Sequence, residues 1–131
     1  MITRLNLTNI AHQYLDKYRA FSEAYDKFVD KYSPTGELGE MARVVADAVS
    51  GGKSLVGGDH AEYDAMVDAT KAIVDAFSSD GIKVYPVVLD SETQFELFFG
   101  VEEVTKELID LLGPDAITEE YEETDDIHVG Y

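Results

Sequence analysis

The sequence contains no cysteine, which excludes disulfide bridges and thiolate metal sites. It also contains no run of about eighteen apolar residues, and residues 1–10 lack the basic and then apolar build of a secretory signal. We therefore expect a soluble, cytoplasmic protein. A chain of 131 residues can bury about two thirds of its unfolded surface, so we expect a single domain over residues 1–131.

Lysine and arginine are scarce: ten basic residues stand against 27 Asp and Glu, for a formal net charge of −17. Residues 1–33 are close to neutral, whereas residues 34–131 carry five basic and 23 acidic residues. The acidic C-terminal segment, residues 115–131, has no Lys or Arg. A field of this sign repels nucleic acid and anionic lipid and attracts basic proteins. We expect a basic protein partner, with no direct binding of nucleic acid or membrane; the alternative is a charge that only solubilises the chain.

One aromatic pattern organises the chain. Residues 14–32 carry a ring at every third or fourth position, at Tyr14, Tyr18, Phe21, Tyr25, Phe28 and Tyr32. This spacing follows one face of a helix and predicts a long helix with Thr8 or Asn9 as its N-cap. Such a stripe is usually core. Because tyrosine is enriched in interfaces, a homo-oligomer formed through this helix is the alternative.

The remaining elements follow from the hydrophobic period and the turn signals. Helices are predicted over residues 37–49, 59–77 and 101–112, with a glycine-rich connector over residues 51–58. Residues 82–89 and 95–99 are predicted to form a hairpin, with a third strand from residues 2–7 or 127–131. Pro86 lacks an N–H, so its strand should be an edge or carry a bulge there. The expected fold class is α+β: three to four helices packed against a small antiparallel β-hairpin or three-stranded sheet.

The motifs that would carry chemistry are incomplete. Gly52-Lys53-Ser54 lacks the first glycine of a phosphate loop, since Asp47 stands at that position. His60 shares a helix face with two aspartates, but no second histidine lies near it in the sequence, and acids in a first turn already stabilise the helix dipole. No nucleophile elbow is present. We expect no enzyme activity, no cofactor and no metal.

Acidic side chains on exposed faces are the candidate site. Duplex DNA carries roughly one negative charge per 1.7 Å of axis. Acids one helical turn apart are separated by a rise of about 6 Å, so adjacent acidic elements can approach that density. Lys71 and Lys106 interrupt the helical stripes. We expect twelve carboxylates to bind the partner: Asp64, Asp68, Asp75, Glu103, Glu107, Asp110, Glu119, Glu120, Glu122, Glu123, Asp125 and Asp126.

In size, charge and helix content the chain resembles the small acidic DNA-mimic inhibitors with which phages block restriction and CRISPR nucleases. The resemblance rests on composition and on no shared motif. It implies a stoichiometric, non-catalytic inhibitor that mimics nucleic acid and blocks a basic nucleic-acid-binding partner. Two alternatives remain open: a phage structural or assembly protein that self-associates or docks on a neighbour, and an immunity protein against a nuclease toxin.

Overall fold

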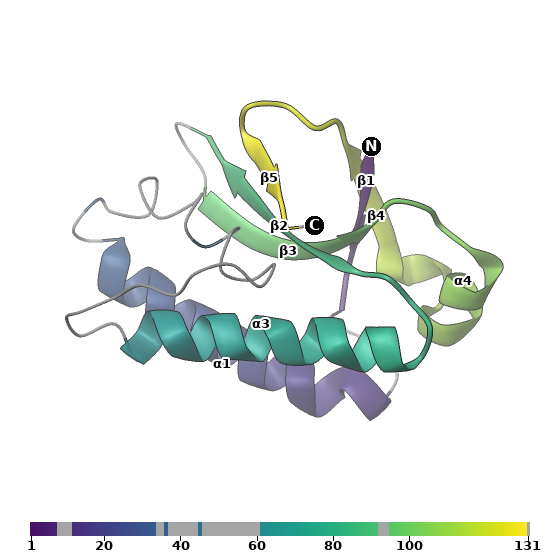
Figure 1. The fold of residues 1–131 in the computed structure, drawn as a ribbon, viewed down its shortest axis with the longest axis horizontal. Helices are drawn as coiled ribbons and strands as arrows, with labels where there is room; N and C mark the ends of the chain where they lie inside the picture. Colours follow the sequence, from purple (N-terminus) through teal and green to yellow (C-terminus); the bar gives the residue numbers. More distant parts are fainter. Residues whose placement is uncertain (8–11, 34–35, 37–44, 46–60, 92–94, 131) are drawn as a thin grey trace.

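The computed structural model describes residues 1–7, 12–33, 36, 45, 61–91 and 95–130 (Figure 1). The predicted helix over residues 37–49 lies outside these ranges except for Val45, which is buried, and so does the connector over residues 51–58. The elements in chain order are β1 (Ile2–Leu5), α1 (His12–Tyr32), α3 (Ala61–Ser79), β2 (Tyr85–Asp90), β3 (Phe95–Val101), α4 (Lys106–Leu112), a 3-10 turn (Pro114–Ala116), β4 (Ile117–Tyr121) and β5 (Ile127–Val129).

The strands form one antiparallel sheet in the order β4-β1-β3-β2-β5, and α1 and α3 lie side by side along one face of it (Figure 1). The α+β class and the β2–β3 hairpin are confirmed. The expected size of the sheet, a hairpin or three strands, is wrong because five strands pair. Both candidates for a third strand join the sheet, as β1 and β5, and the acidic C-terminal segment supplies β4 as well. None of the described helices is long and apolar enough to cross a membrane.

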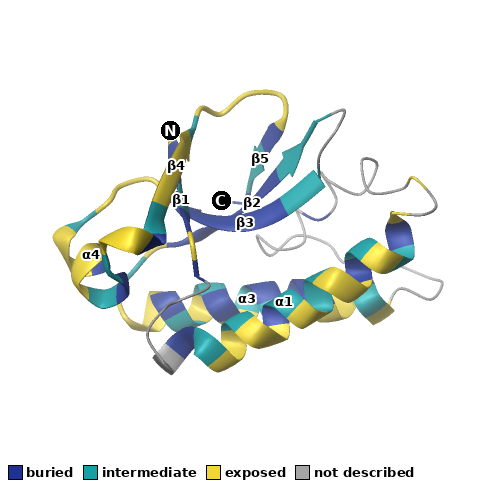
Figure 2. Ribbon diagram, turned by 180° about the vertical axis from the view of Figure 1, so that it is seen from behind, coloured by how far each residue is buried: buried dark blue, intermediate teal, exposed yellow. Residues whose placement is uncertain are grey.

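The aromatic stripe of α1 joins the two layers. Tyr14 stacks on Phe77 of α3 with ring centroids 4.3 Å apart, and Phe21 meets Phe99 of β3 edge-on at 5.0 Å. Phe28 is fully buried. Figure 2 shows the resulting pattern on α1 and α3, with buried positions toward the sheet and exposed positions outside. The stripe is therefore core within this chain, and self-association through α1 stays a prediction.

The other face of the sheet carries a second, smaller apolar cluster formed by Ile2, Tyr85, Val87, Phe98 and Ile127. No described helix covers this face, yet all five side chains are at most 9% exposed. A flat sheet would separate β4 from β5 by about 19 Å. Only residues 122–126 join these two edge strands, and the Ile127 N–H donates to the Thr124 carbonyl at 3.1 Å, which tightens the connection into a turn. The sheet therefore curls around this cluster.

Gly100 lies opposite Arg4 where β3 packs tightly against β1. A Cβ atom at this position would lie 2.4 Å from Cγ2 of Ile2 and 3.1 Å from the Thr3 carbonyl oxygen. Ile2 is fully buried and has little room to move. Glycine is therefore the residue that lets β1 pair with β3 at this point.

Two local predictions are wrong. β2 is an internal strand, not an edge, and it pairs in continuous register with β3. The Pro86 carbonyl accepts from the Gly130 N–H at 2.8 Å. Because N–H and C=O of one residue point to the same side of an antiparallel strand, the side that lacks the N–H faces Gly130, just beyond the end of β5, and the pairing with β3 is not disturbed. The helix expected from residue 101 begins later, because β3 runs through Val101 and Thr105 is the N-cap, accepting from the Leu108 N–H at 3.2 Å.

Replacing Gly100 with alanine should lower the free energy of unfolding by about 1–3 kcal/mol, because the added methyl group overpacks the contact with Ile2. Denaturant unfolding measures the loss. The double variant with Ile2→Ala is the control: removing Cγ2 relieves the clash, so Gly100→Ala should cost less in that background. Equal losses in both backgrounds would contradict this account of the curl.

Candidate functional site

Six of the predicted carboxylates lie on β4 and on the connection that follows it, and we call them the β4–β5 carboxylates. They are Glu119, Glu120, Glu122, Glu123, Asp125 and Asp126, and all are exposed. The scaffold beneath them is fixed by pairing: β4 runs along β1, β5 along β2, and the Asp90 N–H donates to the Asp126 carbonyl at 2.8 Å. No Lys or Arg follows Lys106 in the sequence. These charges are therefore held on a folded surface.

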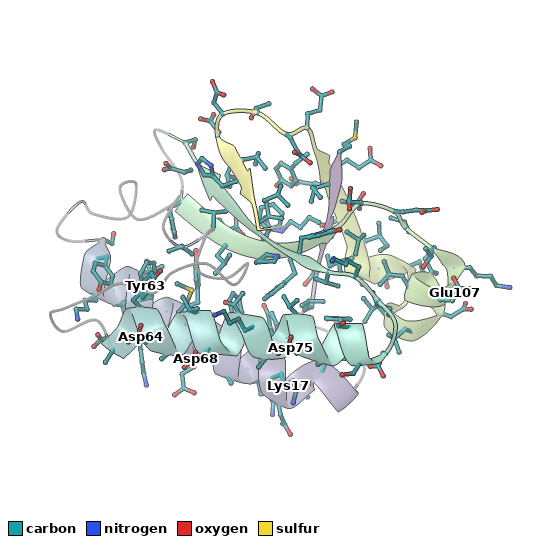
Figure 3. The ribbon with its side chains drawn as sticks, viewed as in Figure 1. Lys17, Tyr63, Asp64, Asp68, Asp75 and Glu107 are labelled. Atoms are coloured by element: carbon teal, nitrogen blue, oxygen red, sulfur yellow. The ribbon has the colours of Figure 1, made fainter. Side chains whose placement is uncertain are left out.

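The other six predicted carboxylates are exposed as well, on different elements. Asp64, Asp68 and Asp75 follow one another along α3, and Glu107 lies on α4 with Asp110 (Figure 3). Glu103 precedes α4 in the loop after β3 instead of lying on the helix as predicted. α3 and the β4–β5 connection lie on opposite sides of the molecule, with α4 beside them (Figure 1). The twelve carboxylates thus form separate groups.

Three of the ion pairs in the structure involve other carboxylates. Lys31 Nζ lies 2.9 Å from Glu62 Oε2, and Lys27 Nζ lies 3.7 Å from Glu23 Oε1. The hydrogen bond from Lys31 lowers the pKa of Glu62. Arg4 pairs with Glu96 across the sheet. None of these three pairs includes one of the twelve predicted residues.

One tyrosine is tied to the acidic surface. The Tyr121 hydroxyl donates to Glu119 Oε2 at 2.6 Å. This hydrogen bond raises the pKa of Tyr121, because losing the proton would place a second negative charge beside the carboxylate. The phenol therefore stays neutral at physiological pH and fixes the Glu119 side chain.

A cavity of about 540 Å³ opens beside β4, at the end of β1, and we call it the edge cavity. Its walls include the rings of Tyr18 and Tyr25 from α1 and the carboxylates of Asp26, Glu96 and Glu119. Arg4 is the one cation among the described residues that line it. The sequence analysis missed this cavity, because it depends on where β1 ends relative to β3.

The Arg4 side chain already has partners within the edge cavity. Its guanidinium pairs with Glu96, and its Cζ lies 4.6 Å from the centroid of the Phe98 ring. The hydrogen bond to Glu96 is the main cause of the raised pKa of Arg4. Three carboxylates against one paired guanidinium make the cavity suited to a cationic group.

Tyr25 closes the inner wall of the edge cavity. Its hydroxyl donates to the Phe95 carbonyl at 3.5 Å and accepts from the Leu97 N–H at 3.4 Å. Both distances exceed the usual 2.9–3.0 Å, so both bonds are weak. Burial is the largest cause of the raised pKa of Tyr25, which therefore remains a neutral donor and acceptor.

A second cavity, of about 740 Å³, lies between α4 and the ends of β2 and β3. The Tyr85 hydroxyl donates there to Glu102 Oε1 at 2.5 Å, and this bond raises the pKa of Tyr85. Neither Tyr nor Glu in this setting is an activated nucleophile. Within the described part of the chain, no group of three His, Asp or Glu is placed to hold a metal ion.

Comparison with known proteins adds no relative: the chain matches no family model, no curated protein and no solved structure.

Tyr25→Phe should lower the free energy of unfolding by about 1 kcal/mol, because it removes the hydroxyl that serves the Phe95 carbonyl and the Leu97 N–H. Tyr18→Phe is the matched control, since Tyr18 lines the same cavity and its ring, not its hydroxyl, makes the contact with Phe21. Denaturant unfolding of both variants measures the difference. Equal stabilities of the two variants would show that the Tyr25 hydroxyl does not hold this edge.

Glu119→Gln should lower the pKa of Tyr121 toward its ordinary value of 10.0, as read from tyrosinate absorbance. In the unmodified protein, the folded state holds the Tyr121 hydroxyl proton more tightly than the unfolded chain does. Its contribution to stability is therefore complete below pH 10 and is lost as the pH rises through the raised pKa. Glu120→Gln, next to it in sequence, is the control and should leave the tyrosine titration unchanged. A pKa of Tyr121 that is unchanged by Glu119→Gln would contradict the assigned hydrogen bond.

Proposed function

We propose that this protein is a small, acidic, non-catalytic interaction protein that mimics nucleic acid and blocks a basic nucleic-acid-binding partner. Phage inhibitors of restriction or CRISPR nucleases act in this way. The observation that carries the proposal is the group of six β4–β5 carboxylates, which are exposed on a paired scaffold in a stretch without a single Lys or Arg.

The charge density of this group supports mimicry of one nucleic-acid strand. Residues 119–126 carry six carboxylates in eight positions. Even a fully extended chain, which rises about 3.3 Å per residue, would space these charges at roughly one per 4 Å, and the turn before Ile127 brings them closer together. A single DNA strand carries one charge per about 3.4 Å of axis and the duplex one per about 1.7 Å. The match is therefore to a strand, and a groove that follows one phosphate backbone is the surface it fits.

The carboxylates of α3 and α4 have a different part in this proposal. They lie away from the β4–β5 carboxylates, so a partner docked on β4 and β5 would not contact the α3 group (Figure 1). Their charge still adds to the long-range field that steers a basic protein to the surface and raises the association rate. We assign direct contact to the β4–β5 carboxylates and steering to the rest.

Self-association is the less favoured role. An assembly protein of this fold would pair its edge strands with a second copy. Glu119 and Glu120 lie on edge strand β4, and like charges on an edge oppose such pairing. An immunity protein against a basic nuclease toxin would use the same acidic surface, so it differs from the first proposal only in the identity of the partner.

The test is capture of a basic partner from a host-cell lysate on the immobilised protein, with a salt gradient and DNA as competitors. Binding should weaken steeply between about 50 and 200 mM salt, because the contacts are ionic. In one variant the six β4–β5 carboxylates become Gln and Asn. Six exposed ion pairs at roughly 0.5 kcal/mol each predict a loss of about 3 kcal/mol, or roughly a hundredfold in affinity.

The control variant removes an equal charge elsewhere: Asp64, Asp68, Asp75, Glu103, Glu107 and Asp110 become Asn and Gln. It should slow association and leave most of the affinity. Equal losses in the two variants, or binding that neither salt nor DNA reduces, would refute the proposed function.

A further inference from the structure

Part of the edge of β3 has no strand beside it among the described residues. β1 pairs with β3 at Val101, Gly100 and Phe99, and β1 ends at Leu5, the partner of Phe99. β3 continues to Phe95 on this side, while β2 pairs with its other side from Phe95 to Gly100. Residues 96–98 of this stretch line the edge cavity, together with Asn6 and Leu7, which follow β1.

The backbone groups of this stretch point into the gap. In an antiparallel strand, alternate residues direct both N–H and C=O to the same side. The Leu97 N–H and the Phe95 carbonyl both meet Tyr25, so they face away from β2 and toward the line of β1. The Tyr25 hydroxyl serves them at 3.4 and 3.5 Å, whereas a peptide backbone could serve both at normal lengths.

The side chains that line the edge cavity indicate which side chains such a peptide would have. In β1 itself, Arg4 pairs with Glu96 on the outer face, and Leu5 is buried in the core under the sheet. A strand that continues this line would again alternate outward and inward side chains. Glu96 and Glu119 line the outer side, and Tyr18 and Phe21 of α1 line the inner side. The complementary sequence alternates basic and apolar residues.

We propose that the edge cavity is the docking site for an extended, alternately basic and apolar segment of the partner protein, which adds to β3 as a strand. Strand addition to a free sheet edge is an established mode of peptide recognition. This inference rests on the proposed function, because it takes the partner to be basic, and it names the part of the partner that binds. Glu119 connects the docking site with the acidic surface, since it is one of the β4–β5 carboxylates and also lines the edge cavity.

Docking requires one local change. The Tyr25 hydroxyl must move away from β3, which breaks its two long hydrogen bonds, and the ring, which stacks on Phe21 with centroids 5.8 Å apart, must shift with it. The ring then stays at the wall of the cavity, where its face can contact a guanidinium or ammonium group. The Tyr25 hydroxyl is thus a competitor of the incoming strand for the Leu97 N–H.

The probe is a fluorescein-labelled seven-residue peptide that alternates arginine and valine, titrated by anisotropy at low salt, with exchange of the Leu97 amide followed by NMR. The peptide should bind, and the Leu97 amide should become strongly protected. A peptide of the same sequence with N-methylated valines carries the same charge without those donors, and it should bind at least tenfold more weakly. Tyr25→Phe removes the competing hydroxyl and should tighten binding severalfold.

Two further variants on α1 separate the cavity from the general acidic field. Ser22 lines the cavity, so Ser22→Trp should fill it and weaken peptide binding at least tenfold. Ala20 is exposed on the same helix and is not among the lining residues, so Ala20→Trp should have no effect. Circular dichroism checks that both variants are folded.

The outcomes are decisive for the docking site. No binding, equal binding of the N-methylated peptide, or binding unchanged by Ser22→Trp would overturn it. A Leu97 amide that exchanges in the free protein as slowly as that of Val101 would also overturn it, because another segment would already cover the edge. If the variant without the β4–β5 carboxylates still loses the lysate partner, the proposed function survives this failure.

Discussion

The structure depends on the packing of the aromatic stripe of α1 between α3 and the sheet. Tyr14 stacks on Phe77, Phe21 meets Phe99, and Phe28 lies within reach of Tyr63, so one helix face joins both layers. Burying one such ring is worth about 1.5–3 kcal/mol. Because the stripe is used for the core, the charged face of the helix layer is left outside, and a chain of charge −17 can still fold.

The curl of the sheet turns the acidic C-terminal segment into a defined surface. β4 pairs with β1 on one edge and β5 with β2 on the other, and residues 122–126 connect the two edge strands. The same arrangement places β1, which ends at Leu5, next to the part of β3 that no other described strand pairs with on this side. Charge and strand edge are therefore adjacent, and the two proposals describe neighbouring parts of one binding surface.

The sequence predicted the elements that depend on local period. The helix expected over residues 14–32 is α1, the described part of the helix expected over residues 59–77 is α3, and β2 and β3 paired as a hairpin. It did not predict β4, because residues 117–121 contain only Ile117 and Tyr121 as apolar members and their pairing partner β1 lies more than a hundred positions away. Likewise, all twelve predicted carboxylates are exposed, but their division into groups and the edge cavity arise from long-range register that no local pattern encodes.

Zero-length carbodiimide cross-linking of the complex with the captured partner tests the central claim most directly, because it joins carboxylates only to lysines in ionic contact. The account predicts cross-links from partner lysines to residues 119–126, few to Asp64, Asp68 and Asp75, and loss of the cross-links at high salt. Cross-links spread evenly over both groups, or concentrated on α3, would contradict it.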